Sequence, residues 1–258
     1  MPLAGLLALL ICGQAPAASA PAPAPPRWTG SVGFNLVSIT GNATAVTLNG
    51  TGGAELKTPE WIYGLKASAT YGVSKATPDA PSQVLALAGS LQARVDRRFN
   101  QMISVYLLGG AEADHVKSVE FRGIGEAGMG LIWISKMEGD LERMLFRTDV
   151  AFRYAHESRF QYYPTPMSLP AADLYAPKLG VAFRYAFSKE VRFVESAEVL
   201  PSVSGDGRVV VNNLTKLTAQ LFGSLAASLG FTLNYDSAPA PGKVPTDTAL
   251  SVGLEYQI

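Results

Sequence analysis

The sequence LSVGLEYQI, residues 250–258, alternates without exception between large apolar side chains and small or polar ones. Because successive side chains of a β-strand point to opposite faces, this stretch predicts a strand with one apolar and one polar face. Residues 61–73 repeat the pattern, with tryptophan, tyrosine, leucine, alanine and valine on one face and Lys66, Ser68 and Thr70 on the other. Similar rows recur along most of the chain, which predicts an all-β protein.

The composition narrows the class of protein. Of the 258 residues, 48% are hydrophobic, and the mean hydropathy is +0.16. Beyond the N-terminal segment no apolar run approaches the ~18–20 residues that a membrane-spanning helix requires. Lysine and arginine together number 21, as do aspartate and glutamate. The composition therefore excludes a helical membrane bundle and gives no indication of a nucleic-acid partner.

The N-terminal segment is typical of an export signal. Residues 1–20 contain no charged side chain, residues 3–12 are almost wholly apolar, and small residues follow them. We interpret residues 1–20 as a signal peptide, residues 21–27 as a Pro/Ala-rich periplasmic leader, and residues 28–258 as the folded protein. Cys12, the only cysteine, lies in the signal. A mature chain without thiols suits the oxidising periplasm.

The alternating rows favour a transmembrane antiparallel up-and-down β-barrel. We expect about twelve strands of roughly 10–14 residues each, an even number of strands long enough to cross a bilayer. If the first strand begins in the periplasm, the short turns near Lys57, Asn100, Gly139, Lys189 and Phe222 all face the periplasm. The long loops, 74–83, 157–173 and 236–246, then all lie outside, as is usual for outer-membrane barrels.

A soluble β-sandwich or soluble barrel also alternates, but its strands average about 5–6 residues, half the length expected here. Two segments fit the pattern poorly. Glu195 falls on the apolar row of residues 191–203, and Asn213 and Thr215 fall on that of residues 208–222. A β-bulge in either segment would reset its register.

Aromatic residues fall at the ends of the expected strands. Amphipathic rings gather at the two lipid–water boundaries of a membrane barrel, and the predicted interface set is Trp28, Trp61, Tyr71, Trp133, Tyr154, Tyr235 and Tyr256. With the first strand starting in the periplasm, the three tryptophans lie at the periplasmic boundary. Tyr71, Tyr154 and Tyr235 lie at the opposite one.

Several short motifs carry a family resemblance. They are Trp28-x-Gly30, Thr40-Gly41-Asn42, Arg98-Phe99-Asn100, Tyr235-Asp236-Ser237 with Pro239, Asp247-Thr248 and Gly253-Leu254-x-Tyr256. With these motifs the chain resembles the Gram-negative salt-induced outer membrane protein family, whose function is undefined. The resemblance implies a β-barrel in the outer membrane and supplies no catalytic residues.

The same resemblance concerns the partners of the chain. The C-terminal strand is similar to the signal read by the barrel-assembly machinery, although Ile258 stands where an aromatic residue is usual. The expected partners are therefore this machinery and the lipid and lipopolysaccharide of the outer membrane. We expect a monomer.

The polar row of the strands carries many charges of both signs. The predicted lumen-lining residues are Lys66, Arg94, Asp96, Glu112, Asp114, Glu126, Arg147, Asp149, Arg153 and Arg184. One interpretation is a hydrated pore whose charges select a solute. The other is a filled interior in which opposite charges pair, because an unpaired charge in a narrow space is costly. An excess of arginine over carboxylates would favour anions in an open pore.

One pattern indicates chemistry. His156-Glu157-Ser158 places a histidine and a serine two residues apart, on one face of a strand, so that His156 could accept the hydroxyl proton of Ser158. The pair resembles the His-x-Ser pair of outer-membrane phospholipases and lipid A deacylases. Arg159 follows where those enzymes tend to have Asn-Gly, and the sequence offers no obvious partner to orient the imidazole.

The sequence predicts a non-enzymatic protein that serves envelope integrity or the limited passage of small solutes. One alternative is a lipid hydrolase that uses His156 and Ser158, and another is a structural barrel with a plugged lumen. Two histidines and a mature chain without cysteine leave little with which to bind a transition metal. We therefore expect neither a metal nor another cofactor.

Overall fold

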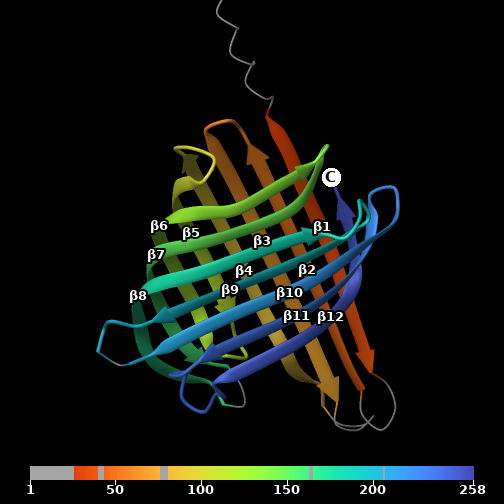
Figure 1. Cartoon of the computed structure of the whole chain (residues 1–258). Helices are drawn as coiled ribbons and strands as arrows, with labels where there is room; N and C mark the ends of the chain where they lie inside the picture. The colour runs from red at the N-terminus through yellow and green to blue at the C-terminus, as the bar shows by residue number, and fades with distance from the viewer. Residues whose placement is uncertain (1–25, 40–43, 76–80, 163–164, 206) are drawn as a thin grey trace, which may run out of the picture.

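The computed structural model describes residues 26–39, 44–75, 81–162, 165–205 and 207–258. These residues form one closed antiparallel barrel of twelve strands (Figure 1), which confirms the predicted fold class and strand number. The signal peptide, most of the predicted leader and the Gly41-Asn42 turn lie outside the described residues. The strands are β1 (Arg27–Ile39), β2 (Thr44–Lys57), β3 (Trp61–Lys75), β4 (Gln83–Arg98), β5 (Ile103–Asp114), β6 (Val119–Glu138), β7 (Leu141–Gln161), β8 (Met167–Ala186), β9 (Val191–Pro201), β10 (Val209–Phe222), β11 (Leu225–Asp236) and β12 (Thr246–Gln257).

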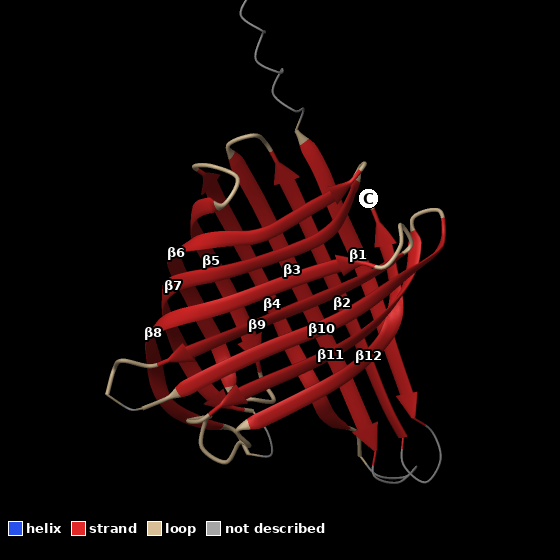
Figure 2. Cartoon of the chain, viewed as in Figure 1, coloured by secondary structure: helices blue, strands red, loops and turns tan. Residues whose placement is uncertain are grey.

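The strands run up and down, each paired with its neighbours in the chain (Figure 2). The LSVGLEYQI stretch closes the barrel, because Gly253–Gln257 of β12 pairs with Ser31–Asn35 of β1. We call the end at which β1 begins the turn end and the opposite end the loop end. Connections at the turn end contain two to four residues, from 139–140 up to 99–102, and those at the loop end up to nine, 237–245.

Two turn-end connections depend on glycine. Gly139 and Gly223 adopt φ values of 61° and 51°, in the left-handed region that glycine enters at little cost. Each glycine begins a two-residue connection, which joins β6 to β7 or β10 to β11. Two-residue hairpin turns favour such conformations because their twist matches that of the flanking strands. The sequence thus encodes the tight turns that were expected at this end.

The outward face of the barrel is apolar from strand to strand. The outward rows expose large side chains to an extent that soluble proteins avoid, for example Leu107 at 67%, Phe152 at 48% and Val252 at 62%. Trp28 and Trp133 are outward and exposed towards the turn end, while Tyr71 and Tyr154 are outward and exposed towards the loop end. This surface is that of a transmembrane barrel, whose outer wall contacts lipid. Among the described residues, no helix is long and apolar enough to span a bilayer.

Strands β6, β7 and β8 exceed the predicted strand length by the most, since they contain 20, 21 and 20 residues. The predicted loop 157–173 is therefore wrong, because β7 continues to Gln161 and β8 begins at Met167. The extension has no apolar alternation to reveal it. Ion pairs on its inward face hold it instead. Glu157 binds Arg159 of the same strand, Arg122 of β6 and Arg208, which precedes β10.

No bulge interrupts the pairing of β9 with β10 at Glu195. The ladder between β9 and β10 is regular throughout, so Glu195, Asn213 and Thr215 all stay on the outward face. Thr215 donates its hydroxyl to Glu195 Oε2 at 2.6 Å, and the Asn213 side-chain amide donates to Oε1. Because the three polar side chains hydrogen-bond to one another, they remain on the outward face without a change of register.

Candidate functional site

The inward face carries a ring of four ion pairs between β4 and β7. Arg94 binds Asp96 and Asp149 at 2.8 Å each, and Arg147 binds the same two carboxylates at 2.7 Å each. Two strands, β5 and β6, lie between the partners. From β5 the buried Tyr106 places its ring 3.5 Å from the Arg94 guanidinium carbon. The ring of charges is therefore a closed and neutral unit.

A glycine makes this ring possible. Gly130 of β6 lies on the inward row beside Asp149, and a Cβ atom built on it would overlap the guanidinium of Arg147. Arg147 can thus lie across β6 to reach Asp96 on β4 because Gly130 has no side chain. Gly130 thus relieves crowding inside the barrel.

A second ring joins four strands nearer the loop end. Glu126 of β6 binds Arg153 at 2.5 Å and Lys178 at 2.7 Å, and Glu198 of β9 binds the same two cations at 2.9 and 3.0 Å. The Tyr106 hydroxyl donates to Glu126 at 2.6 Å, which links this ring to the first one. Both rings lie on the same side of the lumen.

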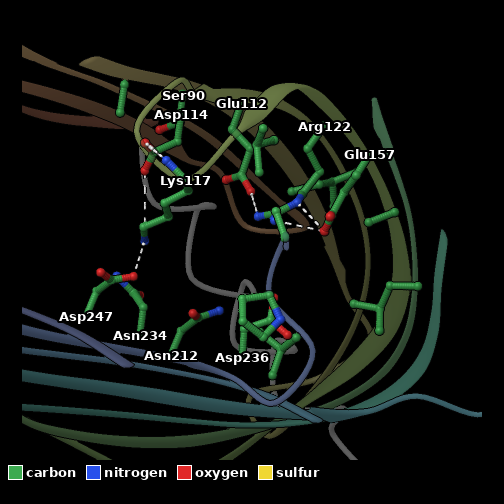
Figure 3. A pocket seen from close by; sticks show the side chains of 18 of the residues that line it. Ser90, Glu112, Asp114, Lys117, Arg122, Glu157, Asn212, Asn234, Asp236 and Asp247 are labelled. Carbon is green, nitrogen blue, oxygen red and sulfur yellow. Dashed lines mark hydrogen bonds and ion pairs between the residues drawn. The ribbon is translucent and has the colours of Figure 1, made fainter. Parts of the chain in front are cut away.

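A third cluster surrounds Glu157, whose side chain is 1% exposed. The Glu157 carboxylate accepts from Arg122 at 2.8 Å and from Arg159 and Arg208 at 2.7 Å. Arg122 also binds Glu112, as Figure 3 shows, and Arg208 binds Asp236 at 2.6 Å. The three clusters together, which we call the ion-pair lattice, extend along the wall from β4 to β10 and reach Asp236 at the end of β11.

The opposite wall, formed by β11, β12, β1, β2 and β3, is different in chemistry. Small uncharged residues dominate its inward rows, among them Gly33, Asn35, Asn49, Thr51, Gly53, Ser68, Thr70, Ser228, Thr232, Ser251 and Gly253. A hydrogen-bonded chain runs across three strands, in which Asn35 donates to Asn49 at 3.3 Å and Asn49 donates to Thr70 at 2.6 Å. Most charges of this wall are paired: Glu55 binds Lys57 at 3.0 Å, Glu255 binds Lys216 of β10, and Asp236 and Asp247 bind Arg208 and Lys117.

Lys66 is the exception within this wall. It points inward from β3 and is exposed to the lumen, and no ion pair is found for it among the described residues. Arg184, predicted with it, lies on the inward face near the turn end and binds Glu142 at 3.3 Å. Seven of the ten predicted lumen residues thus lie in the lattice, and Lys66, Asp114 and Arg184 lie outside it.

A cavity of about 570 Å³ occupies the lumen at the loop end (Figure 3). Glu112, Arg122 and Glu157 line one side, and Asn212, Asn234 and Asp247 face them from β10, β11 and β12. Lys117, in the β5–β6 connection, reaches across the mouth to Asp247 at 3.1 Å. The β11–β12 connection folds over the cavity and buries Ala240. The result is a polar vestibule above the lattice.

One carboxyl at this mouth is perturbed. Asp114 is the last residue of β5, at the loop-end rim, and contributes to the lining of the vestibule. Burial raises the pKa of the Asp114 carboxyl, and a hydrogen bond from the Lys117 backbone amide at 3.1 Å opposes the shift.

The outward face of β7 carries the residues of the predicted His-x-Ser pair. His156 is exposed beside Tyr154, and its Nδ1 lies 2.8 Å from Asp173 Oδ1 on the adjacent strand β8. Tyr154 donates to the same oxygen at 3.0 Å. Ser158 follows on the same face and donates to the Phe121 carbonyl at 3.4 Å. The structure therefore supplies the imidazole partner that the sequence did not reveal.

A family comparison matches residues 32–258 to the family described as "Protein of unknown function, DUF481". The chain belongs to this family. The match agrees with the family resemblance noted from the sequence motifs, although the salt-induced name is not part of the family's description. No curated protein matches this DUF481 chain.

Solved structures similar to the DUF481 chain are distant outer-membrane barrels. The NanC porin is 9% identical with a TM-score of 0.48, covering 89% of this chain and 100% of its own. An outer-membrane channel from Pseudomonas putida F1 is 8% identical with a TM-score of 0.48, covering 90% and 95%. The translocator domain of the autotransporter NalP from Neisseria meningitidis is 10% identical with a TM-score of 0.46, covering 90% and 88%. With TM-scores below 0.5, none of these matches assigns a function to this chain.

The predicted set lacks several charged residues of the DUF481 lattice, among them Glu157, Arg159, Lys178 and Arg208. Lys178 carries a readable signal, since it alternates with Leu179 and Val181 on the strand. Glu157 and Arg159 share a face at a spacing of two, but a loop was expected there. Arg208 lies just before β10, where the strand pattern has not begun.

Proposed function

We propose that this chain is a bacterial outer-membrane barrel that allows limited passage of small solutes along one side of its lumen. The observation that carries the proposal is the asymmetry of the interior. Paired charges fill the wall from β4 to β10, whereas small uncharged side chains dominate the wall of β11, β12 and β1–β3, where Lys66 is exposed to the lumen. Because the lattice bonds to itself, it leaves the opposite wall available to water.

Placement in the outer membrane is supported by the apolar outward face and by the charge-poor segment 1–20, which resembles an export signal. In this placement the turn end faces the periplasm and the loop end faces the exterior. The outward wall contacts lipid, and the long loop-end connections meet lipopolysaccharide. The barrel-assembly machinery would recognise β12, in keeping with its alternation and Tyr256.

The vestibule and the lattice together define the expected permeation path. A solute enters the cavity at the loop end, where carboxylates and arginines of the third cluster meet the amides of Asn212 and Asn234. Below it, the two rings narrow the lumen from one side. Interiors of small eight-strand barrels are filled, and sixteen-strand porins are open. A twelve-strand barrel with one occupied wall suits ions and small polar molecules.

Planar-bilayer recording of the refolded full chain tests this proposal. We expect discrete conductance steps that are small compared with those of open porins. Replacing Asp96 and Arg147 together by alanine removes one charge of each sign, leaves the Arg94–Asp149 pair intact and widens the constriction. The double variant should therefore conduct more than the parent.

The matched control is Thr148→Ala, which truncates an outward residue of the same strand. It should conduct like the parent. Insertion is verified separately by the heat-dependent shift of the folded protein on a gel. A folded and inserted parent chain that produces no conductance step would overturn the proposal and favour the purely structural barrel.

A further inference from the structure

We propose that the lipid-facing wall of the barrel carries a serine esterase site for acyl lipids, with Ser158 as nucleophile, His156 as general base and Asp173 as the residue that positions the imidazole. This activity is separate from passage through the lumen, because all three side chains point away from it.

The contact between His156 on β7 and Asp173 on β8 orients the proposed general base. His156 and Asp173 are directly opposite in the antiparallel ladder, and 2.8 Å separates His156 Nδ1 from the carboxylate. With Nδ1–H donated to Asp173, the other nitrogen, Nε2, is left as a proton acceptor. Both side chains are about half exposed, so this nitrogen is accessible from outside the barrel. Tyr154 holds the same carboxylate oxygen and fixes its orientation.

Ser158 is the hydroxyl that lies on the same face of β7 as this base. Residues two apart on a strand share a face, and Ser158 pairs with the outward Phe121 on β6. The ladder between β7 and β8 passes from Glu157 to Arg159, so the backbone at Ser158 departs from regular pairing. In the structure the Ser158 hydroxyl donates to the Phe121 carbonyl at 3.4 Å, and the proposed attack requires it to exchange this partner for His156. Such contacts are often formed only when substrate is bound.

A groove on the lipid-facing wall provides room for an acyl chain. It runs over β4 to β7, and its outward lining includes Val95, Leu107, Gly109, Gly125, Ala127, Phe152 and Tyr154. No heavy atom lies within 4 Å of a Cβ built on Gly109 or Gly125, so the groove floor is open. Its end at Tyr154 lies two residues from His156 along β7. Gly123, opposite His156, carries no side chain, and the Phe121 ring lies 3.4 Å from the place of its missing Cβ.

The position of the site selects the substrate class. The groove is apolar and faces hydrocarbon, whereas His156 and Asp173 lie towards the loop end, beyond Tyr154 at the boundary of the membrane. A lipid whose chain occupies the groove therefore presents its ester at the level of the pair. We commit to a membrane lipid with an ester-linked acyl chain as the occupant.

The reaction uses only the ester and water. Ser158 Oγ bonds to the ester carbonyl carbon while His156 Nε2 takes the hydroxyl proton. The bond from that carbon to the alcohol oxygen then breaks, and the alcohol leaves with the proton from His156. A water molecule attacks the acyl-serine in the same way, giving its proton to His156, and the fatty acid departs as Ser158 recovers its hydrogen.

Labelling with a fluorescent long-chain alkyl fluorophosphonate tests the nucleophile without knowledge of the natural lipid. The full chain is refolded in detergent micelles, and each variant is first checked for the heat-dependent gel shift of a folded barrel. We expect the parent to label, and Ser158→Ala and His156→Ala to lose labelling. Thr148→Ala, which alters another outward hydroxyl of β7, should label like the parent. Absence of labelling in the folded parent, or equal labelling of Ser158→Ala, would overturn the proposal.

Hydrolysis completes the test. Mixed micelles of detergent and dilauroyl phosphatidylcholine should release lauric acid with the parent and none with Ser158→Ala. The positioning role of Asp173 predicts that Asp173→Asn lowers kcat with little change in KM. An Asp173→Asn variant with unchanged kcat would exclude that role.

Discussion

The charge of Glu157 is predicted to be the most important single charge for the stability of the barrel. Glu157→Gln keeps the shape of the side chain and removes the charge that three arginines share at 2.7–2.8 Å. Arg122 retains Glu112, and Arg208 retains Asp236, whereas the ion pair of Arg159 is formed with Glu157. Loss of one partner from a buried ion pair costs roughly 3–5 kcal/mol. Because two of the three arginines keep a carboxylate, we expect the lower end, about 3 kcal/mol.

Glu112→Gln is the matched control. Glu112 has one ion-pair partner, Arg122, and its side chain is 26% exposed, so the expected loss is below about 1 kcal/mol. The measurement is urea-induced unfolding of the chain in lipid vesicles, followed by tryptophan fluorescence and extrapolated to zero urea. Equal losses for the two variants would refute the reasoning, because they would show that burial and the number of partners do not set the value of these charges.

Three further predictions use the same preparations. Gly130→Val should displace Arg147 and lower the free energy of unfolding by about 1–3 kcal/mol, whereas Gly125→Val, where the structure leaves open space, should stay within about 0.5 kcal/mol of the parent in the urea experiment. Replacing Glu195 and Asn213 together by leucine should leave stability unchanged or raise it by about 1–2 kcal/mol; a larger loss in the same experiment would mean that the outward polar cluster stabilises the barrel. Lys66→Glu should move the reversal potential in a salt gradient towards cation preference, and an unmoved potential would show that Lys66 does not face the permeation path.

The strand pattern could be predicted from the sequence because it is a local property. Whether a residue faces lipid or lumen depends on its parity within the strand, so the inward placement of Arg94 and Glu126 and the outward placement of Leu107 follow from alternation alone. The turn positions follow likewise from glycine and polar residues between the rows. Apolar alternation does not reveal the orientation of Glu195, because this polar residue lies on the outward face among apolar ones.

The partners within the lumen could not be predicted, because they depend on curvature and on the stagger between strands. Arg94 binds Asp149 across two intervening strands, and His156 contacts Asp173 at a separation of 17 residues along the chain. Neither separation has a sequence signature. Glu157 was assigned to a loop because its segment lacks apolar alternation, and the ion pairs that extend β7 there involve residues as distant as Arg208.

The ion pairs that cross β6 depend on an inward glycine of that strand. An arginine on one strand reaches a carboxylate three strands away only if the inward positions between them carry little or no side chain. Gly130 meets this condition beneath Arg147, and Gly110 of β5 lies on the inward row beside Gln92. Inward glycines on a strand flanked by inward arginines and carboxylates therefore indicate ion pairs that cross strands. This explains how the arginines and carboxylates between β4 and β7 pair across the intervening strands.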